Sequence, residues 1–374
     1  MSCNLGSINF NAFVRNPFTE NAFFDTARFQ EVVREMTWGL DDMIEMFRER
    51  HALQEQRDHA KNWMEIVLGV MGLADTALSM GIGYGTPKFI EFLDRTMKTM
   101  INTAAQASAM RAKTHGVYPK YNYENLAASR FYQETLTDET KELIKKYGMR
   151  NSRLLSIAPT GSISNILGVS GGVEPFFMLG YQRTIKSMFE QERTVWVNEK
   201  TPQKMLNHLG LEAPSQLPAW AQITSQNIDF KNRAEVQATI QKYVDTAISS
   251  TFNLPNEANT EDIENIYLTG WKKGFKGATV FRDNCKKIGI LTGGGEHFDK
   301  NPAPFPSIEI FEKWTNKKTG EVNEFVNPIT ITDTDYKAEK IELEVCPECG
   351  AHLVKREGCT QCSNPECYFE KCAI

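Results

Sequence analysis

Leu154-Leu155-Ser156-Ile157-Ala158-Pro159-Thr160-Gly161-Ser162-Ile163-Ser164-Asn165 is the stretch that decides the fold. Its first five residues predict a short apolar strand, and the glycine- and serine-rich turn after them predicts the start of a helix. Such a junction presents free backbone N–H groups and the positive end of a helix dipole, which together bind phosphate. The turn is not a P-loop, because the Gly-Lys-Ser/Thr ending is absent. An ordinary helix cap is the alternative on spacing alone.

Other segments around this stretch indicate an α/β class, with helices outside and strands inside. Apolar residues with helical spacing predict four helices: Arg28–Arg50, a helix opened by Pro87, a stripe from Val236 to Ala247, and a helix from Asn259 or Thr260 to Gly274. Ala278–Phe281 predicts a short buried strand. A second glycine-rich bend, Ser170–Pro175, is expected to help shape the same pocket as the first.

The composition is that of a soluble globular protein. The chain has 374 residues, of which 41% are hydrophobic and 24% charged, and a net charge of -5, which argues against a general binder of polyanions. The longest apolar run, Ile66–Ala74, is far short of the ~20 residues that span a bilayer. The first residues show no secretory signal. We therefore expect a cytoplasmic protein that binds neither nucleic acid nor membrane.

Six of the eight cysteines fall between Cys346 and Cys372, near the end of the chain. Two Cys-x2-Cys pairs suit tetrahedral Zn²⁺, because each pair aims two thiolates at one point. The expected zinc ligands are Cys346, Cys349, Cys359 and Cys362. A loose set of reduced thiols is the alternative.

Cys367 and Cys372 are left over and lie close to the end of the chain, where mobility is greatest. We expect them to be a redox pair that works by thiol–disulfide exchange. The alternative is that one is a zinc ligand and the other a surface thiol. Residues 337–374 carry five Lys/Arg against seven Asp/Glu, so a nucleic-acid-binding ribbon is not indicated.

A boundary is expected near Gly293-Gly294-Gly295, followed by a stretch rich in proline. This gives a compact domain over residues 1–292, a linker over 293–329 and a small cysteine-rich module over 330–374.

Several motifs, in order along most of the chain, resemble the large catalytic chain of ribonucleotide reductase. They are Ser2–Asn9, Leu68–Ala74, Ala158–Ser164, Gly171–Pro175, Thr251–Pro255 and Lys276–Asp283. The Pro-Thr-Gly-Ser turn and the cysteine-rich tail resemble the adenosylcobalamin-dependent class II enzymes more than the class I enzymes.

The resemblance implies a fold and a set of site residues. The fold would be the C-terminal half of a ten-stranded α/β barrel, followed by a zinc-ribbon-like module. Cys3 would be one of two thiols that reduce the ribose, and Cys367 and Cys372 would re-reduce the disulfide. The substrate would be a ribonucleoside diphosphate, bound by Ser2, Pro159, Thr160, Gly161, Ser162 and Ile163.

The family's radical cysteine lies upstream of the position of Cys3, so the resemblance implies an N-terminal complement that carries it. Further implied partners are a thioredoxin-like reductant and a second copy in a homodimer of the complete enzyme; the implied cofactors are adenosylcobalamin and Zn²⁺. Two alternatives are a class I chain with a separate radical-generating subunit and a non-catalytic zinc-binding remnant.

Overall fold

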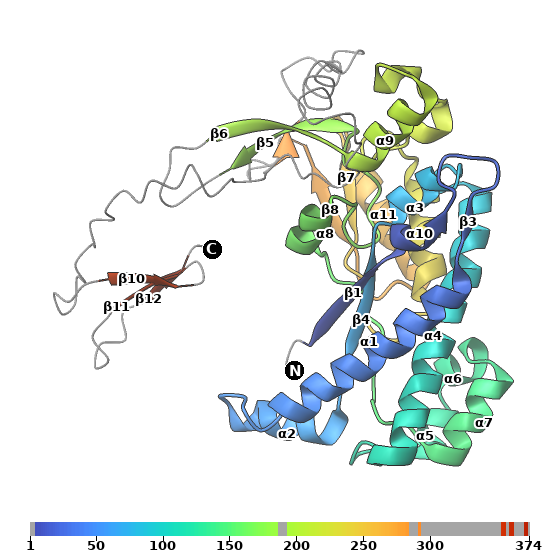
Figure 1. Cartoon of the computed structure of the whole chain (residues 1–374), viewed down its shortest axis with the longest axis vertical. Coiled ribbons are helices and arrows are strands. Elements are labelled where there is room, and N and C mark those ends of the chain that lie inside the picture. The colour runs from blue at the N-terminus through green and yellow to red at the C-terminus, as the bar shows by residue number, and fades with distance from the viewer. Residues whose placement is uncertain are drawn as a thin grey trace, which may run out of the picture. The chain divides into compact units, whose positions relative to one another are not determined.

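The structure is a computed structural model that describes residues 4–185, 193–283, 291–292, 353–356, 359–362 and 370–372 (Figure 1). The chain divides into two compact units, one of residues 1–183 and 195–305, the other of residues 184–194 and 306–374. No helix in the described ranges is long and apolar enough to cross a membrane. The boundaries that we expect at residues 293 and 330 lie outside the described residues.

Five segments of the first unit pair in parallel. Their order is β1 (Leu5–Asn9), β4 (Val67–Met71), residues 154–157, residues 247–250 continuing into β7 (Thr251–Leu254), and β8 (Thr279–Arg282). The expected strand at 154–158 is therefore in the sheet. It pairs through two isolated bridges, Leu68↔Leu155 and Ile157↔Ile248, rather than through a continuous ladder.

The α/β class is confirmed, whereas a closed barrel is not seen. Among the described residues, the outer edges of β1 and β8 pair with no other strand. The predicted half of a barrel is thus an open parallel sheet here. β8 is also less buried than we predict, since Thr279 is exposed and the next three residues are half-buried.

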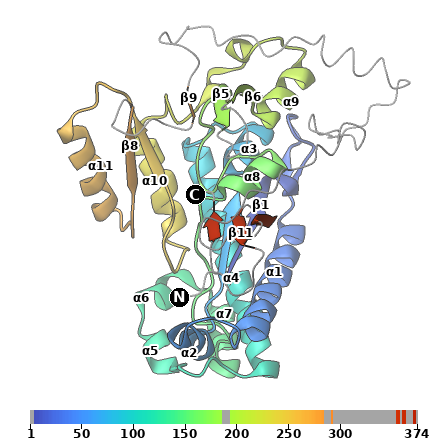
Figure 2. The same ribbon diagram turned by 90° about the vertical axis from the view of Figure 1, so that its left-hand side faces the viewer.

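The four predicted helices are present in the first unit. They are α1 (Thr26–Phe47), α4 (Pro87–His115), α10 (Phe230–Gln241) and α11 (Thr260–Lys272). Pro87 is the first residue of α4, and Asn259 caps α11 with its side chain. Figure 2 shows α11 and β8 at one side of this unit and α1 at the other.

The prediction was wrong about where α10 ends. The apolar stripe runs on to Ala247, but the helix stops at Gln241, and the Nε2 group of Gln241 donates to the carbonyls of Val244 and Thr246 at 3.0 Å. Ala247 already belongs to the sheet, because its carbonyl accepts from Ile157 N at 3.1 Å. The apolar residues that lead into this strand happen to continue the helical spacing, which is why the pattern predicts a helix that is too long.

The described residues also form seven further α-helices, three 3-10 helices (Phe10–Phe13, Pro214–Gln216 and Ala219–Gln222) and several short strands. The helices are α2 (Gln54–Trp63), α3 (Leu73–Ser79), α5 (Tyr123–Ala127), α6 (Arg130–Thr135), α7 (Asp138–Tyr147), α8 (Gly161–Leu167) and α9 (Lys200–Leu209). The strands are β2 (Val14–Arg15) with β3 (Phe23–Phe24), and β5 (Gly180–Ile185) with β6 (Arg193–Asn198) and β9 (Leu291–Thr292).

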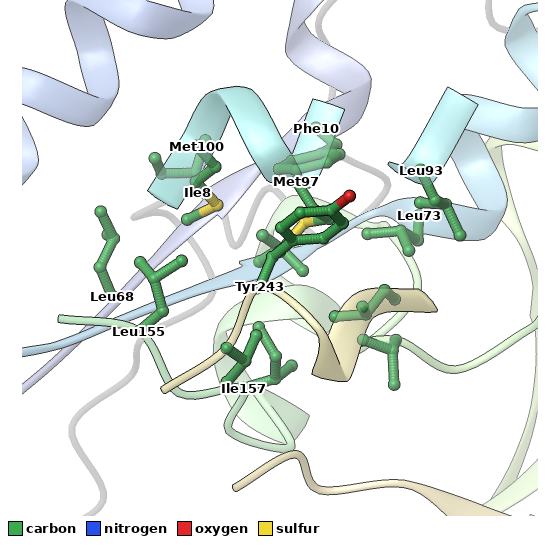
Figure 3. Packing of buried hydrophobic residues seen from close by; sticks show 14 of the residues in the cluster. Ile8, Phe10, Leu68, Leu73, Leu93, Met97, Met100, Leu155, Ile157 and Tyr243 are labelled. Atoms are coloured by element: carbon green, nitrogen blue, oxygen red, sulfur yellow. The ribbon is translucent and has the colours of Figure 1, made fainter. Parts of the chain in front are cut away.

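The core lies between the sheet and α4. Ile8, Leu68 and Leu155 come from three neighbouring strands and face Met97 and Met100 of α4 (Figure 3). Both methionines are fully buried. Burying a side chain of this size contributes roughly 1.5–3 kcal/mol, so this layer stabilises the packing of the strands against α4.

The second unit contains a small antiparallel sheet of β10 (Leu353–Arg356), β11 (Cys359–Cys362) and β12 (Glu370–Cys372). Cys359 is the register partner of Cys372, and Cys362 that of Leu353. The Cys359–Cys362 pair therefore lies in a strand rather than in the turn that its spacing predicts. The zinc module is not confirmed.

Candidate functional site

The phosphate-binding turn that we predict lies at the carboxyl end of the central strand. Residues 154–157 lead through Pro159 to Thr160, which has a φ of 54° and precedes the first turn of α8. The backbone N–H groups of residues 161–163 have no acceptor among the described residues, and all three residues are exposed. Three outward-facing N–H donors can receive an anion.

The alternative of an ordinary helix cap requires the side chain of Thr160 to accept a hydrogen bond from the first N–H groups of α8. It makes no such bond. Its hydroxyl Oγ1 instead accepts a hydrogen bond from Gly172 N at 2.8 Å. Thr160 is buried. The residue therefore fastens the turn to a neighbouring loop and leaves the helical N–H groups free.

That neighbouring loop is the second glycine-rich bend. A Cβ on Gly171 would lie 2.7 Å from the carbonyl oxygen of Pro159, and Gly172 has a φ of 47°. Both positions need glycine, the first for close approach and the second for its backbone conformation. The structure thus brings together the two bends that the sequence suggests share a pocket.

Glu174 anchors the second bend to the sheet. Its Oε1 accepts from Thr251 N at 2.9 Å, and its Oε2 lies 2.8 Å from Nη2 of Arg233. Arg233 is only 2% exposed and also donates to Ser250 Oγ at 2.6 Å and to Tyr84 Oη at 3.3 Å. Burial raises the pKa of Tyr84, so its hydroxyl stays neutral.

The loop that follows α8 is held by a buried carboxylate. Asp75 accepts from Ser170 N at 2.7 Å and from Thr201 Oγ1 at 2.5 Å. Burial raises the pKa of Asp75. Burial, and then the neighbouring charge of Asp75, also raises the pKa of Glu199 to about 8. The loop after α8 is therefore tied to a buried polar group, as is the residue before the helix.

The structure brings Pro159, Thr160, Gly161, Ser162 and Ile163 together at this edge. Ser2, Cys3, Cys346, Cys349 and Cys367 lie outside the described residues, so their predicted roles stay predictions. Cys359, Cys362 and Cys372 lie in β11 and β12. In the ranges that the structure describes, no group of three or more His, Cys, Asp or Glu is arranged to hold a metal ion.

Sequence reasoning missed Arg233 and Tyr84. A signal for Arg233 was present, because it stands three residues before Val236 and seven before Ile240, on the apolar stripe of α10. A charged residue at a core position is a candidate for a specific buried pair. No comparable pattern marks Tyr84.

Comparison with known proteins identifies the family. Residues 1–281 match the family described as "Ribonucleotide reductase, barrel domain". The chain belongs to this family of ribonucleotide reductase barrel domains.

Its relatives include two named "Vitamin B12-dependent ribonucleoside-diphosphate reductase". The chain is 29% identical to the one from Thermoplasma acidophilum, over 84% of this chain and 40% of that protein. It is 28% identical to one from Mycobacterium tuberculosis, over 78% of this chain and 40% of that protein. The chain thus spans about two fifths of the length of these relatives.

The fold agrees with a solved structure of this family. The "class Id ribonucleotide reductase alpha subunit" of Actinobacillus ureae superposes with a TM-score of 0.56 over 76% of this chain and 50% of that chain, at 21% identity. This likeness supports the barrel-domain fold.

Proposed function

We propose that this chain carries part of the catalytic domain of a vitamin B12-dependent ribonucleoside-diphosphate reductase, and that residues 159–163 bind the diphosphate of the substrate. The observation that carries this proposal is the row of N–H groups at residues 161–163, which find no acceptor in the described part of the chain and lie at the carboxyl end of a parallel strand. Ligands of parallel α/β folds bind at that end. The B12-dependent relatives support the choice of reaction.

The chemistry of the turn suits a diphosphate. Its donors are backbone N–H groups and the hydroxyl of Ser162, while Gly161 leaves open space where a Cβ would stand. None of residues 159–163 is charged. The turn therefore orients the anion by hydrogen bonds, and long-range attraction must come from elsewhere in the enzyme.

The cysteines supply the reducing electrons in this proposal. Cys3 and a second thiol outside this chain become a disulfide as the 2′ hydroxyl of the ribose leaves as water, so the dithiol loses two electrons and the ribose gains two. Cys367 and Cys372 then reduce that disulfide by exchange and are themselves reduced by a thioredoxin-like protein. Cys346, Cys349, Cys359 and Cys362 hold a structural Zn²⁺.

Adenosylcobalamin, when bound, supplies the radical that starts the reaction. The donors at the described edge are N–H and hydroxyl groups, which suit an anion rather than a corrin ring. The described edge therefore fits the substrate and not the cofactor. The radical cysteine is proposed to lie on an N-terminal complement.

The test is deoxynucleotide formation from CDP with adenosylcobalamin and dithiothreitol. We expect activity when this chain is mixed with an upstream polypeptide that carries the radical cysteine, and none with the chain alone. Cys3→Ser should abolish that activity, whereas Cys285→Ser is the matched control and should retain it. Activity with a separate metal-carrying subunit and without cobalamin would instead establish the class I alternative, and activity under neither condition would favour a non-catalytic remnant.

A further inference from the structure

Arg233 is a fully buried cation on α10. A contribution to the stability of the fold does not by itself explain why a charged residue is buried there. Arg233 is 2% exposed, and its guanidinium lies 5.7 Å from the ring centre of Phe252. Its Nε has no hydrogen-bond partner among the described residues. A well-packed apolar pair commonly stabilises a fold at least as well as a buried ion pair, so burial of this charge indicates a demand for one conformation.

The contacts of Arg233 lead directly to the phosphate-binding turn. Nη2 of Arg233 lies 2.8 Å from Glu174 Oε2, and Glu174 N donates to Gly171 O at 2.9 Å. The next residue of the same bend, Gly172, donates to Thr160 Oγ1 at 2.8 Å. Three successive hydrogen bonds thus connect a buried cation to the residue that precedes α8.

A second contact fixes the same bend from the other side. The hydroxyl of Tyr84 donates to the carbonyl of Val173, between Gly172 and Glu174, and accepts from Arg233 Nη1 at 3.3 Å. Arg233 therefore contacts Glu174, Ser250 and Tyr84 at once. A planar guanidinium offers several donors in a fixed geometry, whereas a lysine would offer one point charge.

We propose that the Arg233–Glu174 pair, with Tyr84, is the positioning element that holds the phosphate-binding turn ready for the diphosphate. This inference rests on the function proposed above. Arg233, Glu174 and Tyr84 act through the Gly171–Gly172 bend and Thr160, so they are positioning residues. Their loss displaces the N–H groups of residues 161–163 without removing any of them.

The test uses the whole chain and two measurements on Glu174→Gln, Arg233→Lys and Tyr84→Phe. The first is CDP affinity by titration calorimetry, where we expect about tenfold weaker binding, the equivalent of one lost hydrogen bond. The second is amide hydrogen exchange without ligand, where peptides covering residues 158–174 should exchange faster while those of β4 keep their protection. Tyr84→Phe keeps the ring and all charges, so it tests the proposal even if a charge variant does not fold.

The matched control is Arg150→Lys. Arg150 is also buried, and it pairs with Asp41 at 3.2 Å, away from the turn. This variant should lose stability yet bind CDP like the wild type and show normal exchange at residues 158–174. If it weakens CDP binding as much as the site variants do, or if none of the three site variants changes exchange in the turn, the positioning role is wrong. If wild type binds no CDP even when it is mixed with the upstream polypeptide, the proposed function fails, whereas exchange still decides whether the pair holds the turn.

Discussion

Gly172 donates its backbone N–H to the side-chain hydroxyl of Thr160 at 2.8 Å, across twelve residues of sequence. The bond is buried and joins the two glycine-rich bends at the carboxyl edge of the sheet. It also explains why Thr160 leaves the first N–H groups of α8 uncapped. This one hydrogen bond therefore joins the two loops and also leaves the N–H groups of α8 available, as the proposed function requires.

Thr160→Val should break this bond while it keeps the shape of the side chain. The N–H of Gly172 would be buried without an acceptor, which costs about 1–3 kcal/mol of the free energy of unfolding. We also expect weaker CDP binding, because the turn loses its attachment. Chemical denaturation and CDP titration measure the two effects. Thr160→Ser retains the hydroxyl and should restore both, so equal behaviour of the two variants would contradict the role of the bond.

Gly171→Ala and Gly161→Ala should separate folding from binding. A Cβ on Gly171 meets the Pro159 carbonyl at 2.7 Å, so the bends must move apart, at about 1–3 kcal/mol. A Cβ on Gly161 meets nothing within 4 Å, and alanine within a helix is about 0.5–1 kcal/mol more favourable than glycine. We expect both variants to bind CDP more weakly, but only Gly171→Ala to be destabilised. Unchanged CDP affinity in Gly161→Ala would show that the phosphate does not approach this backbone.

Glu199→Gln should change how stability depends on pH. Burial, and then the charge of Asp75, raises the pKa of Glu199 from 4.5 to about 8. The folded state therefore keeps a proton that the unfolded state has lost, and the free energy of unfolding falls as pH rises from about 4.5 to about 8, by on the order of 1.4 kcal/mol per pH unit.

Glutamine stays neutral and removes this contribution. The variant should gain stability relative to wild type between pH 5 and pH 9, as measured by denaturant titration at both values. The exposed Glu212→Gln is the control and should follow wild type. A constant difference between Glu199→Gln and wild type at the two pH values would contradict the raised pKa of Glu199 in the folded state.

Substitution of Asp245 should lower the free energy of unfolding more than substitution of most other polar residues near the sheet. Its carboxylate accepts from Leu154 N at 2.7 Å and Leu155 N at 2.9 Å, where the central strand begins. Burial raises the pKa of Asp245 to about 6 although both bonds lower it. It lines a cavity of about 700 Å³ at this end of the strands.

Asp245→Ala leaves two buried N–H groups without an acceptor, so we expect a loss of about 2–5 kcal/mol in the free energy of unfolding. Asp245→Asn keeps one acceptor oxygen and should fall between alanine and wild type. The control is Glu134→Ala, which removes an exposed ion pair with Arg130 and should cost less than about 1 kcal/mol. Equal losses for Asp245→Ala and Glu134→Ala, measured by denaturant titration, would contradict this role.

The tail should bind one Zn²⁺ per chain. A strong chelator or the variant Cys362→Ser should release the metal, whereas Cys285→Ser should keep it. Elemental analysis measures the zinc content of each protein. Cys372 lies opposite Cys359 in the register of β11 and β12, so Cys372→Ser distinguishes the two predicted roles. Zinc retained in that variant fits a redox thiol, and zinc lost makes Cys372 a ligand. A metal-free wild-type protein would contradict the site.

Features that depend on neighbouring residues were predictable from the sequence. The helices α1 and α11 begin and end close to where their apolar periodicity and caps predict, and α4 begins at Pro87 as predicted, because helical hydrogen bonds join residues four apart. The turn at residues 158–164 was likewise visible, since a short apolar strand followed by glycine and serine is a local pattern. The family resemblance could also be recognised from the sequence, because it is carried by motifs of five to eight residues.

What the sequence by itself determined is therefore the α/β class, the extents of α1 and α11, the start of α4 and the turn that carries the proposed site. Only the tertiary structure decided which polar groups hold that turn. Tyr84 and Arg233 meet across 149 residues, and Glu174 and Arg233 across 59. The tertiary structure also decided that α10 stops at Gln241, because residues 247–250 pair with the central strand. Such contacts arise when distant segments pack against one sheet, and local periodicity carries no information about which segments will be neighbours.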